Sequence, residues 1–179
     1  MSIRVPIELL IDDHMMPIED EPEYELANFA AGCFWGVESA FKCIKGVLET
    51  TVGYMGGTTP NPTYKQVCTG TTGHAETVQI KYDPKVISYE DLLSVFWRIH
   101  NPTTPNRQGP DIGTQYCSAI FYHNEAQRLA AEKSKEDYDR SGIYLDKAVT
   151  KIAPASTFYP AKDYHQDYFD KCDGRSCPL

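Results

Sequence analysis

Hydrophobic positions follow two different periods along the chain, and this predicts both strands and helices. A largely apolar run at Leu26–Ala31 predicts a buried strand. The segment that follows repeats apolar residues at the i, i+3, i+4 and i+7 spacing of one helix face: Val37, Ala40, Phe41 and Ile44. Gly46 is expected to end this helix, because glycine commonly follows the last helical residue.

The same two periods continue to the end of the chain. Further strands are predicted at Val47–Tyr54, Glu76–Tyr82, Tyr116–Tyr122 and Ala148–Ala153. Further helices are predicted after Ser88, from Asn124 to Gly142 and over Lys162–Phe169. This order is neither a strict alternation of strands and helices nor strands alone. It predicts an α+β fold, a single-domain two-layer sandwich in which helices cover a mixed β-sheet.

Length and local composition divide the chain into three parts. The 179 residues fit one domain, since domains commonly span about 100–200 residues. Residues 1–25 contain an acidic run and show no sustained period, so we expect an N-terminal extension there. Residues 26–170 form the predicted domain, and residues 171–179 form a C-terminal tail that carries two cysteines.

Charge and cysteine content exclude several classes of protein. The chain has 17 Lys and Arg against 25 Asp and Glu, a net charge of −8, and therefore lacks the basic field that nucleic-acid binding requires. No apolar run approaches the ~20 residues of a membrane span, and Glu8, Asp12 and Asp13 interrupt any signal-peptide core. We therefore expect a cytoplasmic protein without membrane association. Six cysteines are too few for a disulfide scaffold in this chain, which leaves chemistry or packing to explain them.

Cys33 is the first candidate for chemistry, because it lies where the first strand turns into the first helix. The unpaired N–H groups and the dipole of a helix N-terminus stabilise a thiolate, so we expect a lowered thiol pKa at this position. Gly32 and Gly36 on either side would allow close approach of a ligand. The alternative is an inert core cysteine next to two aromatic residues.

Glu76 is the second candidate. Alternation along its strand places it on the same face as Val78, Ile80 and Tyr82. Burial on this apolar face would raise the carboxyl pKa and suit the residue to general acid catalysis near neutral pH. The alternative is that Glu76 lies at the strand end and simply reaches water.

Tyrosines in loop segments could complete a polar site. The chain contains 12 tyrosines, and Tyr54, Tyr64 and Tyr116 each lie next to Gly-, Pro- or Thr-rich stretches. Their phenols can donate hydrogen bonds to a substrate oxygen, although each alone is typical of packing with the hydroxyl at the surface. Asp111 lies in the long loop between Asn101 and Gly113, where aspartate is usually a turn residue.

The C-terminal tail carries Cys172 and Cys177, which could reach a reactive sulfur elsewhere and act as resolving cysteines. A metal pair with His165 is the rival interpretation, but three ligands fall short of the four that structural zinc requires, and we predict no metal site. Cys43 and Cys68 are expected to be inert filler.

Several ordered blocks of this chain resemble the peptide methionine sulfoxide reductases of the A type. The similarity covers roughly residues 26–169, and the ordered spacing of the blocks makes it specific. The matching blocks are Gly32-Cys33-Phe34-Trp35-Gly36, Gly53-Tyr54-Met55-Gly56-Gly57 through Asn61-Pro62-Thr63-Tyr64, Gly73-His74-Ala75-Glu76, Asp111 with Gly113-Thr114-Gln115-Tyr116, and Tyr164-His165-Gln166.

The resemblance implies a repair enzyme that reduces methionine S-sulfoxide, free or in peptides and proteins, without a bound cofactor. Cys33 would attack the sulfoxide sulfur and become a sulfenic acid, which a second thiol converts to a disulfide that thioredoxin then reduces. Glu76 would protonate the sulfoxide oxygen. The resemblance assigns the other contacts as follows: Tyr64 and Tyr116 to the oxygen, Asp111 to the polar side, and Phe34 with Trp35 to the S-methyl group.

The chain departs from the family pattern at Cys117, where relatives carry arginine. Alternation from Tyr116 turns Cys117 to the opposite face, which favours packing and leaves a resolving role open. Two other classes of protein compete with the reductase. A cysteine hydrolase would need a histidine base beside Cys33, and a zinc-binding or peptide-binding module would have no catalytic activity. Neither alternative explains an acid on the apolar face of a strand.

Overall fold

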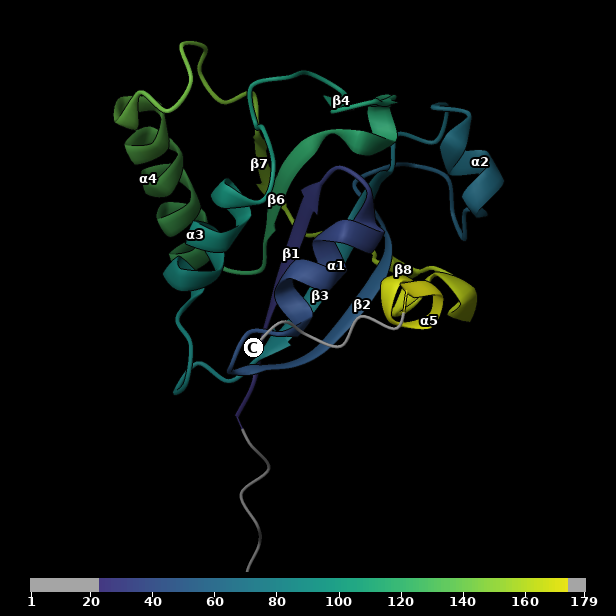
Figure 1. The fold of residues 1–179 in the computed structure, drawn as a ribbon, viewed down its shortest axis with the longest axis horizontal. Coiled ribbons are helices and arrows are strands. Elements are labelled where there is room, and N and C mark those ends of the chain that lie inside the picture. The colour runs from purple at the N-terminus through teal and green to yellow at the C-terminus, as the bar shows by residue number, and fades with distance from the viewer. Residues whose placement is uncertain (1–22, 174–179) are drawn as a thin grey trace, which may run out of the picture.

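A six-stranded mixed sheet forms the centre of the computed structural model, which describes residues 23–173 (Figure 1). The strand order is β7-β6-β1-β3-β2-β8, and every neighbouring pair is antiparallel except β6 and β7. This arrangement confirms the predicted α+β class and the mixed sheet. The strands are β1 (Glu25–Ala31), β2 (Val47–Met55), β3 (Ala75–Tyr82), β6 (Ser118–Tyr122), β7 (Lys151–Pro154) and β8 (Tyr159–Pro160).

Helices pack on one face of this sheet. Figure 1 shows α1 lying across the centre, α3 and α4 on the side of β6 and β7, and α5 beside β2 and β8. A two-stranded hairpin, β4 (Arg107–Gln108) with β5 (Asp111–Ile112), stands apart from the main sheet. The helices are α1 (Phe34–Lys42), α2 (Tyr64–Cys68), α3 (Tyr89–Arg98), α4 (Glu125–Ser141) and α5 (Tyr168–Asp173), with short 3-10 turns at Thr114–Tyr116 and Asp163–His165.

The main hydrophobic core lies between the sheet and these helices. Phe29 of β1 stacks on Phe41 of α1 and contacts Phe96 of α3, with ring centroids 5.5 and 5.2 Å apart. All three rings are fully buried, and burial of one such side chain contributes about 1.5–3 kcal/mol. A smaller cluster on the opposite face includes Ala30 and Phe121, which alternate with the core positions along their strands.

Several predicted boundaries hold, because capping residues mark them. Ser88 caps α3 through a reciprocal bond pair with Asp91, and Asn124 caps α4 by accepting the N–H of Gln127. Gly142 ends α4 in the left-handed conformation. The first helix, in contrast, ends at Lys42, four residues before the predicted Gly46.

Other predicted boundaries of strands and helices were wrong. The strand predicted from Tyr116 begins at Ser118, because Thr114–Tyr116 forms a 3-10 turn. The last long strand begins at Lys151 rather than Ala148. The single C-terminal helix predicted from Lys162 is two short elements, separated where Asp167 adopts a positive φ of 53°.

The helix α2 was not predicted at all. Thr63 accepts the N–H of Gln66 while the Gln66 side chain accepts the N–H of Thr63, a reciprocal cap that the Thr-x-x-Gln spacing encodes. Across residues 23–173 no helix is long and apolar enough to cross a membrane.

Candidate active site

Cys33 occupies the N-cap of α1, directly after β1, as the sequence predicts. Gly32 makes the turn between the two elements with a φ of +95°, which favours glycine. A Cβ at this glycine would lie 2.8 Å from the side chain of Gln108 in β4. The absence of a side chain at Gly32 therefore lets the β4–β5 hairpin, and Asp111 with it, approach the cysteine.

The pKa of the Cys33 thiol is raised to about 11, mainly by burial, and this contradicts the lowered pKa expected at a helix N-terminus. The N–H groups of Trp35 and Gly36 do lower it, as the helix start predicts. Burial outweighs them, and the nearby charges of Glu76 and Asp111 raise the pKa further. The thiol is therefore held protonated until its surroundings change.

Glu76 lies on the apolar face of β3 with Val78 and Ile80, and it is only 2% exposed, so the alternative that it reaches water is wrong. Burial raises the pKa of its carboxyl group to about 7, and the charge of Asp111 adds to the rise. The N–H of Phe34 donates to Oε2 of Glu76 over 3.1 Å. This bond ties the acid to the first turn of the helix that carries Cys33.

Asp111 and two of the predicted tyrosines complete the polar side. Burial and the charges of Glu76 and Asp111 raise the pKa of Tyr116 to about 12. The three side chains are therefore close enough to interact electrostatically. Burial also raises the pKa of Tyr64, and its hydrogen bond with the Cys68 side chain and the charge of Glu76 act in the same direction. The structure thus brings the predicted polar residues together.

Phe34 and Trp35 form an aromatic cluster at the start of α1, which we call the apolar side. Phe34 is fully buried against Tyr54, with ring centroids 5.8 Å apart. Trp35 is partly buried and stacks face to face on Tyr168 of α5 at 3.8 Å. The two aromatic residues therefore join the start of α1 to the sheet and to α5.

The role of His165 was missed, although its block was recognised. Its ring is 1% exposed, and its Nδ1 accepts the indole N–H of Trp35 over 3.1 Å. It also packs against the ring of Tyr64 at 4.5 Å. Among residues 23–173 its Nε2 has no hydrogen-bond partner, and burial lowers its pKa. The histidine links the apolar and polar sides, a link that only side-chain packing reveals.

A second histidine positions the loop that leads to α2. His74 is buried, its Nδ1 accepts the N–H of Gly57 over 3.0 Å, and its Nε2 lies 2.7 Å from the carbonyl oxygen of Thr59. A Cβ at Gly57 would lie 2.4 Å from backbone atoms of Thr72 and His74, so only glycine fits. This contact fixes the entry to α2 and hence the place of Tyr64.

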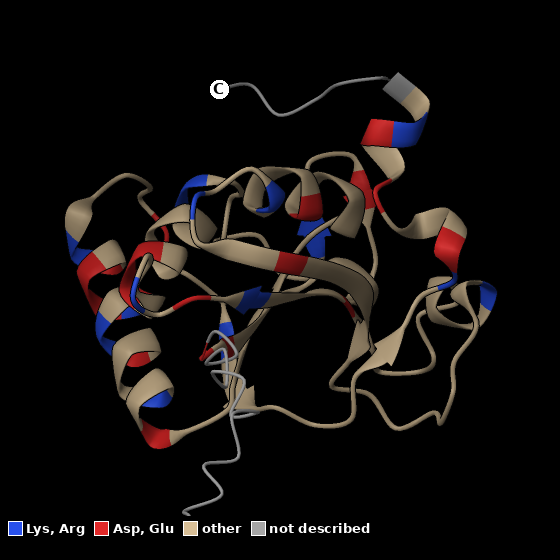
Figure 2. Cartoon of the chain, turned by 90° about the horizontal axis from the view of Figure 1, so that it is seen from below, with Lys and Arg blue, Asp and Glu red and all other residues tan. Residues whose placement is uncertain are grey.

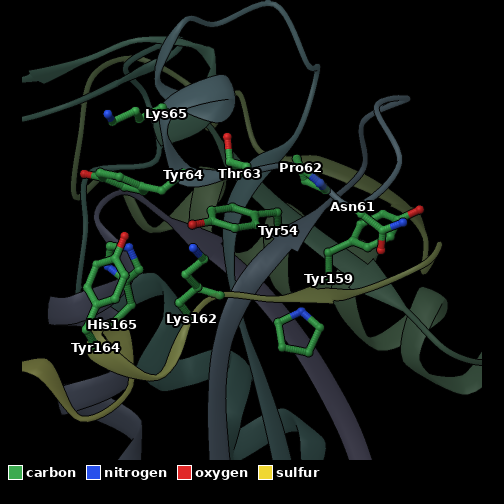
Figure 3. A pocket seen from close by; sticks show the side chains of 12 residues that line it. Tyr54, Asn61, Pro62, Thr63, Tyr64, Lys65, Tyr159, Lys162, Tyr164 and His165 are labelled. Atoms are coloured by element: carbon green, nitrogen blue, oxygen red, sulfur yellow. The ribbon is translucent and has the colours of Figure 1, made fainter.

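An open cavity of about 530 Å³ adjoins this cluster on the side of Tyr64. Tyr54, residues 61–65 and residues of the 159–165 segment line it, and Figure 3 shows their side chains around the opening. Cys33 and Glu76 are not among its lining residues. We call it the flanking cavity, because it shares Tyr54, Tyr64 and His165 with the cluster but is not lined by the two candidate reacting residues.

The remaining cysteines differ from one another. Cys172 is exposed on α5, which packs against α1, whereas Cys177 lies outside the described residues. Cys43 is exposed and disulfide-bonded, so its description as inert filler was wrong. Cys68 is a free, exposed cysteine whose side chain forms a hydrogen bond with Tyr64. Cys117 packs against the smaller hydrophobic cluster, in agreement with its predicted packing role.

One rival function, a histidine-activated hydrolase, finds no support in the described part of the chain, whereas the zinc alternative involves Cys177, which lies outside it. Residues 23–173 contain no group of three or more side chains that could hold a metal ion. The ring nitrogens of the buried histidines in this range form hydrogen bonds with Trp35, Gly57, Thr59, Phe96 and Ser118, and none with Cys33. A histidine-activated hydrolase therefore lacks its base in this arrangement.

Comparison with known proteins identifies the family. The family model described as peptide methionine sulfoxide reductase matches residues 25–179. The peptide methionine sulfoxide reductase MsrA of Methanosarcina acetivorans is 60% identical over 147 residues, which are 82% of this chain and 78% of that protein. The crystal structure of Mxr1 from Saccharomyces cerevisiae in reduced form matches with a TM-score of 0.80 at 40% identity, over 89% of this chain and 92% of that one.

Mxr1 in complex with Trx2 also matches, with a TM-score of 0.59 at 28% identity over 83% of this chain and 87% of that one. The family model spans nearly the whole described fold, including both Cys33 and Glu76. The chain belongs to the peptide methionine sulfoxide reductase family.

Proposed function

We propose that this protein reduces the S epimer of methionine sulfoxide to methionine, with Cys33 as the nucleophile and Glu76 as the acid. One observation carries the assignment: a buried carboxyl group with a pKa of about 7 is tied by the Phe34 N–H to the helix start that holds the thiol. A sulfoxide oxygen must gain a proton as its sulfur is attacked. A carboxyl pKa of about 7 supports Glu76 as the donor of that proton near neutral pH.

The two groups work in sequence. The Cys33 thiolate attacks the sulfoxide sulfur while the oxygen takes the proton of Glu76. A bond then forms between this hydroxyl oxygen and the Cys33 sulfur, while the substrate S–O bond and the transient bond between the two sulfurs break. Methionine leaves and Cys33 is a sulfenic acid, so the substrate sulfur gains two electrons and Cys33 loses two. Protonated Glu76 carries no charge, and its part in raising the Cys33 pKa then disappears. Protonation of the acid therefore favours formation of the thiolate beside it.

Tyr64 and Tyr116 are proposed to donate hydrogen bonds to the sulfoxide oxygen, with Asp111 ordering this polar side. Burial keeps the pKa values of both phenols above the ordinary value, so they remain donors throughout the physiological range. Phe34 and Trp35 are proposed to hold the S-methyl group. An oxygen site and a methyl site fixed relative to the attacking thiol discriminate between the two epimers of a chiral sulfur.

Recycling is proposed to use the C-terminal tail and thioredoxin. Cys172 lies on α5, which packs against the helix of Cys33, and Cys177 follows five residues later. Either thiol would condense with the sulfenic acid to a disulfide. The related Mxr1 forms a complex with Trx2, which supports thioredoxin as the external reductant. This cycle suits a cytoplasmic protein, because that compartment supplies reduced thioredoxin.

Intact mass after one turnover tests both steps. Fully reduced protein is mixed with methionine S-sulfoxide without reductant. We expect the native protein to lose two hydrogens, and the Cys172→Ser/Cys177→Ser double variant to gain one oxygen. Cys117→Ser serves as the matched control and should behave as the native protein does. Turnover by Cys33→Ser would refute the nucleophile, and a gain of oxygen by the native protein would remove the tail cysteines from the cycle.

A further inference from the structure

We infer that the flanking cavity binds a carboxylate of the substrate peptide, through Lys65 and Lys162, and gives this enzyme a preference for oxidised methionine near an acidic group. The inference rests on the proposed function, since it concerns what surrounds the methionine sulfoxide bound at Cys33. The carboxylate can come from an Asp or Glu side chain next to the oxidised methionine, or from the C-terminus of the peptide.

Charge distinguishes this cavity from the rest of the molecule. The chain carries a net charge of −8, yet the 12 lining residues include two lysines and no carboxylate. Asp163 neighbours Lys162 in sequence but does not line the cavity, and its carbonyl oxygen accepts a bond from Lys171. The two ammonium groups of this lining therefore favour an anion, in a protein whose overall charge repels one.

Both lysines lack an ionic partner among residues 23–173. Some basic side chains in this range pair with acids, as Lys42 does with Asp167 and Lys135 with Asp139, whereas others, such as the exposed Lys85, have no ion pair within it either. Figure 2 shows the acidic and basic positions interleaved along α4, where most of the ion pairs lie. Lys65 and Lys162 make no such pair, so their ammonium groups are available to a ligand.

Geometry connects the cavity with the reacting group. Tyr64 both lines the cavity and lies within the electrostatic reach of Glu76, and Tyr54 pairs with Glu76 across β2 and β3. Figure 3 shows the polar ends of Tyr54, Lys162 and Tyr164 pointing toward one open space. A volume of about 530 Å³ lies within the roughly 300–1,000 Å³ of ligand pockets. It thus accommodates a residue adjacent to the oxidised methionine.

The expected preference is moderate, because Lys65 and Lys162 are exposed and water screens their charges. Exposed ion pairs of this kind change an equilibrium about two- to fivefold each, so two lysines give roughly a 4- to 25-fold preference in kcat/KM at low salt. The preference should shrink as salt rises toward ~1 M, where the screening length falls to about 3 Å.

The test compares blocked peptides that differ by one group. Each peptide holds one methionine S-sulfoxide, flanked on either side by Asp or by Asn, and a further pair carries a free or an amidated C-terminus. Acid-to-amide ratios of kcat/KM are measured for the native protein, for Lys65→Glu, for Lys162→Glu and for the double variant. Lys85→Glu is the matched control, since Lys85 is exposed, undergoes the same charge change and does not line the cavity.

The inference is supported if the acid-to-amide ratio of kcat/KM is above one in the native protein and in Lys85→Glu, and below one in the double variant. The peptide pair that shows this preference identifies the source of the carboxylate. Equal rates for acid and amide peptides in the native protein would overturn it. So would a preference that persists in the double variant, or that is lost equally in Lys85→Glu.

The uncharged substrate N-acetyl-methionine-S-sulfoxide methylamide tests the proposed function separately from this inference. It carries no carboxylate, so its kcat/KM should change less than twofold in every lysine variant. If the native protein reduces this substrate but shows no preference for acidic over amide peptides, only the cavity assignment is refuted. Failure of the native protein to reduce it would refute the proposed function and, with it, the inference.

Discussion

Replacement of Glu76 by glutamine separates the acid from the nucleophile, because the amide keeps the shape of the side chain but has no proton to deliver. From a pKa of about 7, Glu76 is about 90% protonated at pH 6 and about 10% at pH 8. The thiolate fraction of Cys33, with a pKa of about 11, rises about tenfold per pH unit over the same range. The active form needs protonated Glu76 and deprotonated Cys33 together.

The product of these two fractions gives the expected pH profile. In the native protein it rises about tenfold from pH 6 to pH 8 and then levels off, because the loss of the acid cancels the gain of the thiolate. In Glu76→Gln only the thiolate titrates, so kcat/KM should keep rising, about tenfold from pH 8 to pH 9. The rate itself should fall about 10²–10⁴-fold at neutral pH, the usual loss for a missing general acid.

The assay is single-turnover loss of methionine S-sulfoxide at pH 6–9.5, so that recycling does not limit the rate. Glu90→Gln is the matched control, since Glu90 is exposed in the first turn of α3 and should leave the profile unchanged. A plateau above pH 8 in Glu76→Gln, with the same shape as the native profile, would refute the acid role. A loss of less than tenfold at neutral pH would do the same.

Two further expectations concern stability. Because the folded pKa of Glu76 is raised from 4.5 to about 7, the folded protein holds this proton longer than the unfolded chain, and the free energy of unfolding should fall by about 3 kcal/mol as pH rises from 4.5 to 7. Urea denaturation at pH 4.5 and pH 8 should show this decrease in the native protein and a smaller one in Glu76→Gln; equal decreases would contradict the raised pKa. Gly57→Ala should lower the free energy of unfolding by about 1–3 kcal/mol, because its Cβ would meet backbone atoms at 2.4 Å. In the same measurement Gly36→Ala should be neutral or stabilising, since the nearest atom lies at 3.9 Å inside a helix, and an equal loss in both variants would count against the fit at Gly57.

Local sequence determined the parts of the site that depend on periodicity and capping. Alternation along one strand placed Glu76 on the core face, because side chains two residues apart must share a face of a sheet. The junction of an apolar strand and an amphipathic helix placed Cys33 at a helix start. The Thr63 and Gln66 spacing also encodes α2, which was not among the predicted helices.

Only the tertiary structure decided how these residues act on one another. The thiol pKa of Cys33 is raised rather than lowered, because burial and the charges of Glu76 and Asp111 outweigh the helix start, and those charges come from other segments. The hydrogen bond between Trp35 and His165 joins residues far apart in the sequence. Lys65 and Lys162, about 100 positions apart, line the same cavity. Sequence periodicity reports which face a side chain occupies, whereas long-range packing sets its neighbours and hence its charge state, partners and specificity.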